Sequence, residues 1–99
     1  MANDLSVVIV GGGIWGFSTA YHLARQGVSD VCVLEQNTEA AAETTPRAAG
    51  LVGQIRSSRV MCDAVQYALD LFSHFREETG HDPGLHRTGS LLVAMTSQR

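Results

Sequence analysis

The segment VVIVGGGIWG, residues 7–16, constrains the fold of this chain more than any other feature. Four apolar residues that favour a strand run directly into glycines spaced G-x-G-x-x-G, at Gly11, Gly13 and Gly16. In a strand–turn–helix of this kind, the first glycine permits the sharp turn and the second lets the backbone approach a pyrophosphate. The third lets the helix lie close to the sheet. Phosphates would then meet the free N–H groups at the amino end of the helix, so the segment predicts a dinucleotide-binding turn.

The residues after this turn complete the pattern of a βαβ unit. A helix is predicted for residues 14–26, with Ala20 on the small-residue face toward the sheet and Gly27 as the C-cap. A second apolar strand, predicted for residues 31–35, ends in Glu35. This carboxylate falls about 20 residues beyond the last glycine, where it can accept hydrogen bonds from an adenosine ribose. A glycine-rich turn that binds nothing would need neither the spaced glycines nor the acid at the strand end.

The fold class that follows is α/β, a Rossmann-like βαβ unit with parallel strands. Its first strand, residues 6–10, is a continuous apolar run, as in a sheet buried on both faces. A chain of 99 residues forms at most one small domain. A complete dinucleotide-binding sheet needs more strands than this sequence supplies, and the chain ends soon after the apolar run 91–95. We therefore expect an incomplete domain, the N-terminal portion of a larger enzyme or a truncated product.

The second half of the chain predicts a long loop, a long helix and a strand. Residues 36–58 have no sustained periodicity, and a structureless segment of this length in a compact domain is usually functional. The helix is predicted for residues 59–79, with Ser57 or Ser58 as N-cap and Gly80 at its end. A strand interrupted by glycine is predicted for residues 86–95. The apolar stripe of the helix consists of Met61, Val65, Ala68, Phe72 and Phe75.

Composition excludes several classes of protein. The formal net charge is −3 and the seven basic residues are scattered arginines, so no basic stripe indicates nucleic acid. No apolar run approaches the roughly 18 residues of a membrane span, and no secretory signal is evident. Cys32 and Cys62 are expected to be reduced structural thiols, and the four histidines show no metal-ligand spacing. We therefore expect a cytoplasmic protein without a metal site.

Position alone does not separate FAD from NAD, since Glu35 could hold either adenosine ribose. The parts that follow the second strand distinguish the two cofactors. They are a small-residue loop, a long helix, and then Gly89-Ser90-Leu91-Leu92. This order resembles the flavin-dependent oxidoreductases of the D-amino-acid oxidase superfamily. Within that superfamily, the segment TTPRAAGLVGQIRS, residues 44–57, is most similar to the sarcosine and dimethylglycine dehydrogenase branch. The resemblance covers essentially the whole chain.

The resemblance implies that residues 1–99 are the incomplete FAD-binding domain of a larger two-domain flavoprotein. The enzyme would oxidise the C–N bond of an N-methylated or cyclic amino acid, such as sarcosine, dimethylglycine or a proline derivative. Hydride would pass to the flavin, and electrons then to oxygen or an acceptor protein; the 99-residue form alone is expected to be inactive. The cofactor contacts that the resemblance implies, with their neighbours in the motifs, are Gly11, Gly13, Ile14, Trp15, Gly16, Glu35, Gln36, Thr44, Thr45, Arg47, Ala48, Ala49 and Gly50.

One departure from the family pattern concerns the flavin linkage. Members of this branch with covalently attached flavin carry a histidine just before the Ala-Ala-Gly stretch, where this chain has Arg47. Arginine is not nucleophilic enough to form that bond, so the prediction is non-covalent FAD. Arg56 and Arg47 are also candidates to grip a substrate carboxylate or stabilise reduced flavin. The alternative for each is a surface arginine or one on the pyrophosphate side, and no general base is evident.

Two rival functions stay open. The first is a flavoprotein dehydrogenase that oxidises a hydroxy acid or glycerol phosphate. The second is a truncated, non-catalytic nucleotide-binding remnant or subunit.

Overall fold

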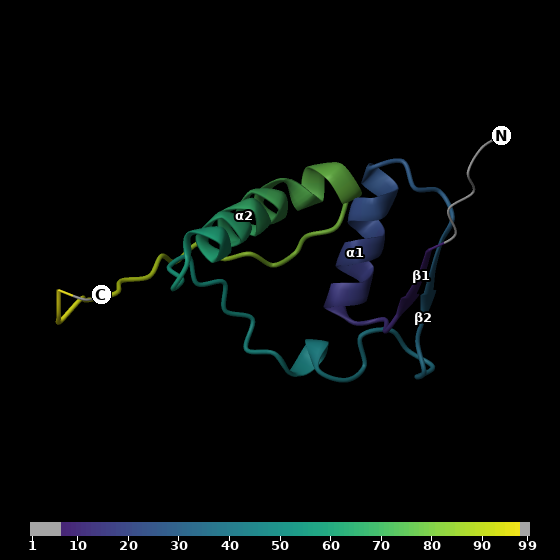
Figure 1. Ribbon diagram of the computed structural model, residues 1–99, viewed down its shortest axis with the longest axis horizontal. Coiled ribbons are helices and arrows are strands. Elements are labelled where there is room, and N and C mark those ends of the chain that lie inside the picture. Colours follow the sequence, from purple (N-terminus) through teal and green to yellow (C-terminus); the bar gives the residue numbers. More distant parts are fainter. Residues whose placement is uncertain (1–6, 98–99) are drawn as a thin grey trace. The chain divides into compact units, whose positions relative to one another are not determined.

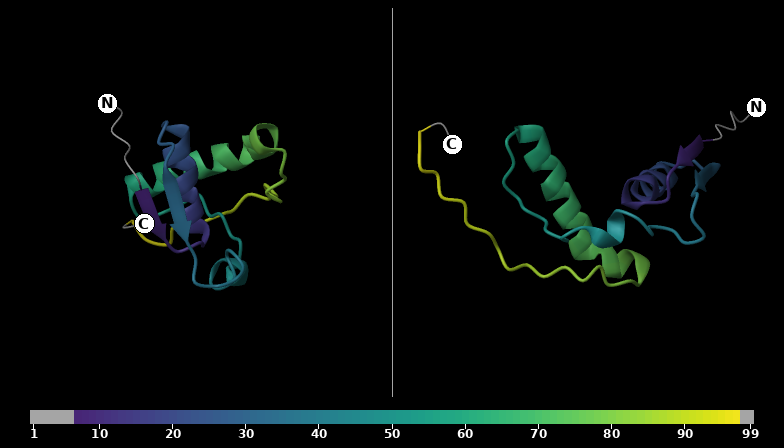
Figure 2. Two further views of the ribbon diagram at one scale, coloured as in Figure 1. Left: turned by 90° about the vertical axis from the view of Figure 1, so that its right-hand side faces the viewer. Right: turned by 90° about the horizontal axis from the view of Figure 1, so that it is seen from below.

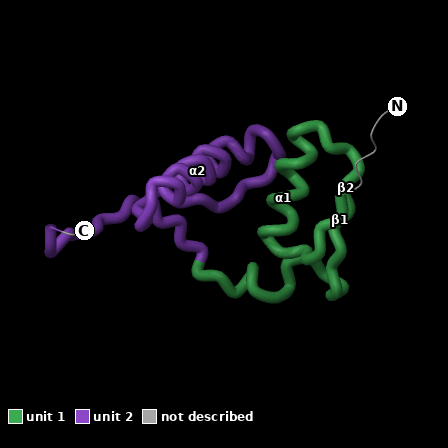
Figure 3. Tube along the Cα trace, viewed as in Figure 1, with its two compact units in different colours: residues 1–49 green, residues 50–99 purple. Residues whose placement is uncertain are grey.

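The computed structural model describes residues 7–97. Two units are seen in the chain, residues 1–49 and residues 50–99 (Figure 3). The first contains the strands and the second contains the longer helix. The elements in chain order are β1 (Val7–Val10), α1 (Ile14–Arg25), β2 (Val31–Leu34), the 3₁₀ turn η1 (Thr45–Arg47) and α2 (Arg59–Thr79) (Figure 1).

The two strands of the first unit form a parallel pair. Their register runs from Val7 opposite Val31 to Val10 opposite Leu34. The ladder continues at the carboxyl end, where the Gly11 N–H donates to the Leu34 carbonyl at 2.8 Å. The predicted α/β class with parallel strands is therefore confirmed. The predicted first residue of β1, residue 6, lies outside the described residues, and Glu35 directly follows β2.

Helix α1 covers one face of this pair (Figures 1 and 2). Val7 and Ile9 of β1 are half-buried on the covered face, and Gly16 of α1 is buried. On the opposite face, Val8 is 59% exposed and Val10 is 86% exposed. The prediction of a sheet buried on both faces is therefore wrong for the described residues, because only one face of the sheet receives a helix.

The ends of both helices follow the capping signals in the sequence. α1 ends at Arg25, one residue before the predicted end, so its C-cap is Gln26 and not the predicted Gly27. Gly27 comes next, with a φ of +88°. α2 has the predicted bounds, with the Ser58 Oγ accepting the Met61 N–H at 3.3 Å. Gly80 ends it in the left-handed conformation, at a φ of +78°. A side-chain acceptor at one end and a glycine at the other satisfy backbone groups that the helix cannot pair itself.

The apolar stripe of α2 is shifted from the predicted one. Leu69 is its most buried residue, at 4% exposed. Met61 was predicted in the stripe but is 50% exposed, whereas the neighbouring Cys62 is half-buried. The half-buried members are Cys62, Val65, Ala68, Leu71, Phe72 and Phe75.

Two further predictions are wrong. Residues 86–95 do not form a strand, because a strand needs a hydrogen-bonded neighbour and no described strand pairs with them. Leu91 and Met95 are each 90% exposed. Residues 44–50 are not entirely loop, since Thr45–Arg47 form a single 3₁₀ turn. Pro46 is compatible with it because it occupies the first turn, where a missing N–H is harmless.

We predict that Gly16→Ala destabilises the protein. A Cβ at this position would collide with the Gly11 carbonyl oxygen, so α1 would have to move away from the strand end. Helix propensity alone predicts a gain of about 1 kcal/mol for this change, whereas overpacking costs about 1–3 kcal/mol or more. The sign of the change in denaturant unfolding free energy therefore separates the two effects.

The matched control is Gly13→Ala, whose Cβ would lie 3.3 Å from the Thr45 Oγ1, a contact that a small shift relieves. Gly16→Ala should cost clearly more than Gly13→Ala. Equal costs would show that the contact with Gly11 does not limit the fold.

Candidate dinucleotide site

The candidate site is built where β1 ends and α1 begins. Gly11 has a φ of +113°, a conformation that residues with a side chain rarely adopt. The chain can therefore turn sharply and enter α1 with Gly13 as an extended N-cap. Gly16 follows one turn into the helix, directly over the Gly11 carbonyl. This arrangement presents the first turn of α1 beside the carboxyl end of β1.

The amino end of α1 has donors without partners. Among residues 7–97, the N–H groups of Gly13, Trp15 and Gly16 donate to no acceptor. No acidic side chain lies in the first turn. Bare N–H groups and the positive end of the helix dipole together favour an anion. The backbone therefore fits the pyrophosphate of a dinucleotide.

Within the described residues, Thr45 supplies the one side-chain oxygen that accepts an N–H from the first turn of α1. Its Oγ1 accepts the Ile14 N–H at 3.1 Å. It comes from η1, 31 positions further along the chain. The hydroxyl leaves the other three N–H groups available, so it lines the anion site without filling it.

Glu35 lies against the glycine turn, on the side of β2. Its Oε2 accepts the Gly12 N–H at 2.8 Å. Its Oε1 accepts the backbone N–H of Asn37 at 2.9 Å and the Asn37 Nδ2 at 3.1 Å. Hydrogen bonds from Asn37 and then from Gly12 lower the pKa of Glu35 below its ordinary value, because these donors favour the ionised carboxylate.

Gly12 has room for Glu35 only because it has no side chain. A Cβ there would lie 2.9 Å from the Glu35 Oε2 and 3.0 Å from the Glu35 Cβ. The carbonyl of Gly12 is also held, since it accepts the Ala41 N–H at 2.8 Å. Ala41 adopts a φ of +56° to make this bond. Glu35 and Ala41, which both follow β2, therefore hold the N–H and the carbonyl of Gly12.

The structure brings only part of the predicted set together. Gly11, Gly13, Gly16, Glu35 and Thr45 surround the amino end of α1. Ile14 and Trp15, which were predicted as neighbours in the glycine motif, also present their N–H groups at this helix end. The side chain of Trp15 is 87% exposed. Within the described residues, no hydrogen bond joins the amino end of α1 to the remaining predicted residues of the first unit: Gln36, Thr44, Arg47, Ala48 and Ala49.

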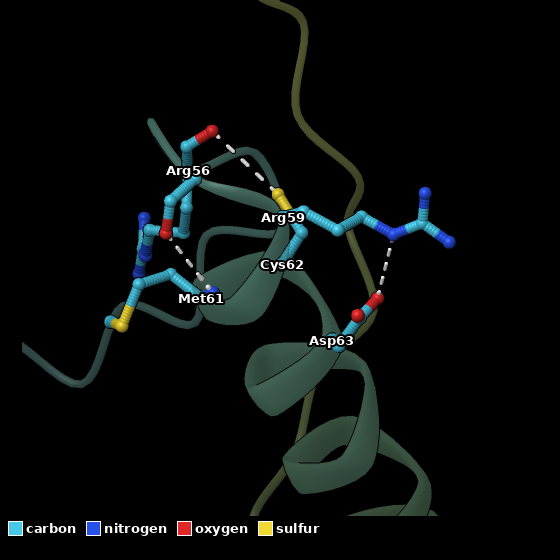
Figure 4. Close-up of polar contacts among 6 residues, drawn as sticks. Arg56, Arg59, Met61, Cys62 and Asp63 are labelled. Atoms are coloured by element: carbon cyan, nitrogen blue, oxygen red, sulfur yellow. Dashed lines mark hydrogen bonds and ion pairs between the residues drawn. The ribbon is translucent and has the colours of Figure 1, made fainter.

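Gly50 and Arg56 belong to the second unit. The Arg56 carbonyl accepts the Cys62 thiol, with a sulfur–oxygen distance of 3.6 Å, which fastens this segment to the start of α2 (Figure 4). The neighbouring Arg59 pairs with Asp63 at 3.3 Å (Figure 4). Within residues 7–97, neither Arg47 nor Arg56 forms an ion pair. The Arg56 Nη1 donates to the Ile55 carbonyl at 3.4 Å.

Sequence reasoning missed Asn37 and Ala41, which fix the loop after β2. No sequence signal marks Ala41. Its role depends on a left-handed backbone conformation, which glycine or asparagine at this position would have indicated but alanine does not. Asn37 carried a weak signal as an amide two residues after the strand-end acid.

The geometry agrees with what the comparison with protein families finds. Residues 6–99 match the family model described as FAD dependent oxidoreductase. The chain belongs to this family. The FAD dependent oxidoreductase family implies FAD, and two features of the site fit such a cofactor. The first is the set of free N–H groups at the amino end of α1. The second is Gly16, where any Cβ would meet the Gly11 carbonyl and push α1 away from the glycine turn.

Several relatives match nearly the whole chain, among them the three described next. The 4-methylaminobutanoate oxidase (formaldehyde-forming) of Paenarthrobacter nicotinovorans is 42% identical over 100% of this chain and 12% of that protein. The mitochondrial pyruvate dehydrogenase phosphatase regulatory subunit of Mus musculus is 42% identical over 94% of the chain and 10% of that protein. The mitochondrial dimethylglycine dehydrogenase of Rattus norvegicus is 40% identical over 93% of the chain and 11% of that protein.

The mitochondrial sarcosine dehydrogenase of Mus musculus is also similar, at 37% identity over 100% of this chain and 11% of that protein. These matches confirm the predicted resemblance to sarcosine and dimethylglycine dehydrogenases. The chain spans only 10 to 12% of the length of the three relatives described. No solved structure matches the chain significantly. In the part of the chain that the structure describes, neither helix is long and apolar enough to cross a membrane.

We predict that Glu35 stabilises the folded chain at neutral pH and loses this effect in acid. Its pKa is lower in the folded than in the unfolded chain, so folding is favoured while the carboxyl is ionised. The contribution is fully present above the ordinary glutamate pKa of about 4.3. It is lost as the pH falls from there through the lowered pKa of the folded chain.

Denaturant unfolding of the wild type and of Glu35→Gln, from neutral pH down to about 3, measures this difference. The wild type should be the more stable protein at neutral pH, and its advantage should shrink below about pH 4.3. An advantage that stays constant over the whole range would contradict the pairing of Glu35 with Gly12 and Asn37.

Proposed function

We propose that residues 1–99 are the incomplete FAD-binding domain of an oxidoreductase that acts on the C–N bond of an N-methylated or cyclic amino acid. The observation that carries this proposal is the bare amino end of α1 beside Glu35. The substrate class is supported by relatives named for dimethylglycine and 4-methylaminobutanoate, which match nearly the whole chain. Bound FAD would supply the two-electron acceptor for the oxidation.

The residues of this chain would bind and orient the cofactor. The N–H groups of Gly13, Trp15 and Gly16 would hold the pyrophosphate, and Glu35 would hold the adenosine ribose. Thr45 would line the same end of α1 from the loop side. Among the remaining predicted contacts, Gln36, Thr44, Ala48, Ala49 and Gly50 stay proposals on the family resemblance.

A cytoplasmic location belongs to the same proposal. It is supported by Cys32 and Cys62, which form no disulfide. The electron acceptor would be oxygen or a redox protein, and the substrate a small amino acid.

A second candidate is favoured by one specific finding. The regulatory subunit of Mus musculus is as similar to this chain as the 4-methylaminobutanoate oxidase is, at 42% identity. A nucleotide-binding subunit without catalysis is therefore the alternative. Such a protein would bind FAD, yet no substrate would reduce it.

We predict that an N-methylated amino acid bleaches the bound flavin. The experiment mixes the full-length flavoprotein that carries this chain, without oxygen, with sarcosine, dimethylglycine, proline derivatives, hydroxy acids and glycerol phosphate. Loss of the yellow absorbance with a methylated or cyclic amino acid supports the proposal. Bleaching only by a hydroxy acid or glycerol phosphate would favour the hydroxyl-oxidising alternative, and no bleaching at all would favour the regulatory one.

Steady-state turnover of the same protein, with an electron acceptor supplied, tests Arg56 with a matched control. Arg56 has no ion-pair partner among the described residues, and its guanidinium can grip a carboxylate with two parallel hydrogen bonds. Arg56→Lys should raise the KM for the amino acid about tenfold, the equivalent of one hydrogen bond to a charged group. Arg59 is the first residue of α2 and pairs with Asp63, so Arg59→Lys should leave KM unchanged. An unchanged KM in Arg56→Lys would remove Arg56 from the substrate site.

We predict that the FAD is held without a covalent bond. Arg47 stands where covalent members of the branch carry a histidine, and a guanidinium does not attack the flavin. Acid precipitation of the yellow protein should therefore release all of the flavin into the supernatant, measured by its absorbance. Flavin that stays on the denatured polypeptide would contradict this prediction while leaving the flavoprotein assignment intact.

A further inference from the structure

The loop after β2 contains a polar network that the proposed binding roles do not yet use. Asn37 donates twice to one oxygen of Glu35, from its backbone N–H at 2.9 Å and from its Nδ2 at 3.1 Å. The other oxygen of Glu35 accepts the Gly12 N–H at 2.8 Å. Three donors from two residues therefore fix the plane of this carboxylate.

The side-chain amide of Asn37 is itself held in place. Its Nδ2 also donates to the Glu43 Oε1 at 3.1 Å. The Gln36 Nε2 donates to the same Glu43 oxygen at 3.0 Å. An amide nitrogen carries two hydrogens, so Asn37 gives one to each carboxylate. The amide thus joins Glu35 and Glu43, two negative groups that would otherwise repel each other.

The network determines which oxygen of Glu35 is more open to a further donor. An ionised carboxylate offers about four lone-pair positions, two on each oxygen. Asn37 donates twice to Oε1 and Gly12 donates once to Oε2, and the backbone N–H of Gln36 adds a smaller contribution to the carboxylate. Oε2 receives fewer of the three close donors, and it is the oxygen that faces the glycine turn.

We propose that Asn37 is a positioning residue that presents Glu35 to the adenosine ribose through Oε2. The other oxygen serves the protein by keeping the carboxylate against Gly12. This proposal rests on the proposed function, since it assumes a cofactor with an adenosine ribose. It assigns to Asn37 an effect on the adenosine half of the cofactor alone.

FAD and FMN together isolate that effect. Both carry the isoalloxazine ring and the ribityl phosphate, but only FAD carries the adenosine. Asn37→Ala removes the amide that joins Glu35 to Glu43 and leaves Glu35 with backbone donors alone, so the direction of Oε2 is less fixed. The affinity of the full-length apoprotein for FAD should fall about tenfold, and its affinity for FMN should not change. Unchanged FMN binding also shows that the variant is folded.

The controls use the neighbouring residues of the same loop. Thr38→Ala removes an exposed side chain that makes no hydrogen bond to Glu35 and should alter neither affinity. Asn37→Asp places a third carboxylate between Glu35 and Glu43, so it should weaken FAD binding more than Asn37→Ala does. Fluorescence quenching of each flavin during titration gives the dissociation constants.

The outcomes separate the positioning role of Asn37 from the proposed function of the chain. Equal losses for FAD and FMN in Asn37→Ala would show a merely structural role and overturn the inference. No loss of FAD affinity would overturn it as well. If Glu35→Ala weakens FAD binding while Asn37→Ala does not, the ribose site stands and the positioning role is lost. If the unsubstituted apoprotein takes up no FAD, the proposed function itself fails.

Discussion

The close approach of α1 to the end of β1 is the constraint on which the candidate site depends. A Cβ at Gly16 would meet the Gly11 carbonyl, so the helix reaches this position only with glycine there. The approach brings the first turn of α1 beside the strand end, and it leaves the N–H groups of Gly13, Trp15 and Gly16 without acceptors among the described residues. Leaving polar groups unpaired carries an energetic cost that only a ligand or water can offset. The family match and the backbone geometry therefore support one interpretation, in which an anionic cofactor completes this helix end.

The electrostatics of the site combine an anion-binding helix end with a nearby carboxylate. A negative Glu35 next to a pyrophosphate would weaken binding if its charge were uncompensated. The donors of Gly12 and Asn37 offset that charge and at the same time lower the pKa of Glu35. Glu35 can therefore stay ionised and accept a ribose hydroxyl, while the free N–H groups of α1 are left for phosphate oxygens.

The sequence predicted the features that depend on neighbouring residues better than those that depend on contacts between distant residues. The strands, both helices and the glycine turn follow from periodicity, capping residues and the glycine spacing, which are all local signals. The failure at residues 86–95 is non-local, because an apolar run becomes a strand only beside another strand. Thr45 was predicted at the cofactor, but no sequence pattern predicts its hydrogen bond to Ile14, because the two residues are 31 positions apart. Asn37 and Ala41 act through the folded loop, so their roles appear only in three dimensions.

A crystal structure of the full-length protein with FAD bound tests the central claim most directly. Pyrophosphate oxygens should lie within hydrogen-bond distance of the N–H groups of Gly13, Trp15 and Gly16, and one ribose hydroxyl should donate to the Glu35 Oε2. If the cofactor is bound elsewhere and this helix end is filled by side chains or water, the assignment of the glycine turn as the dinucleotide site is contradicted.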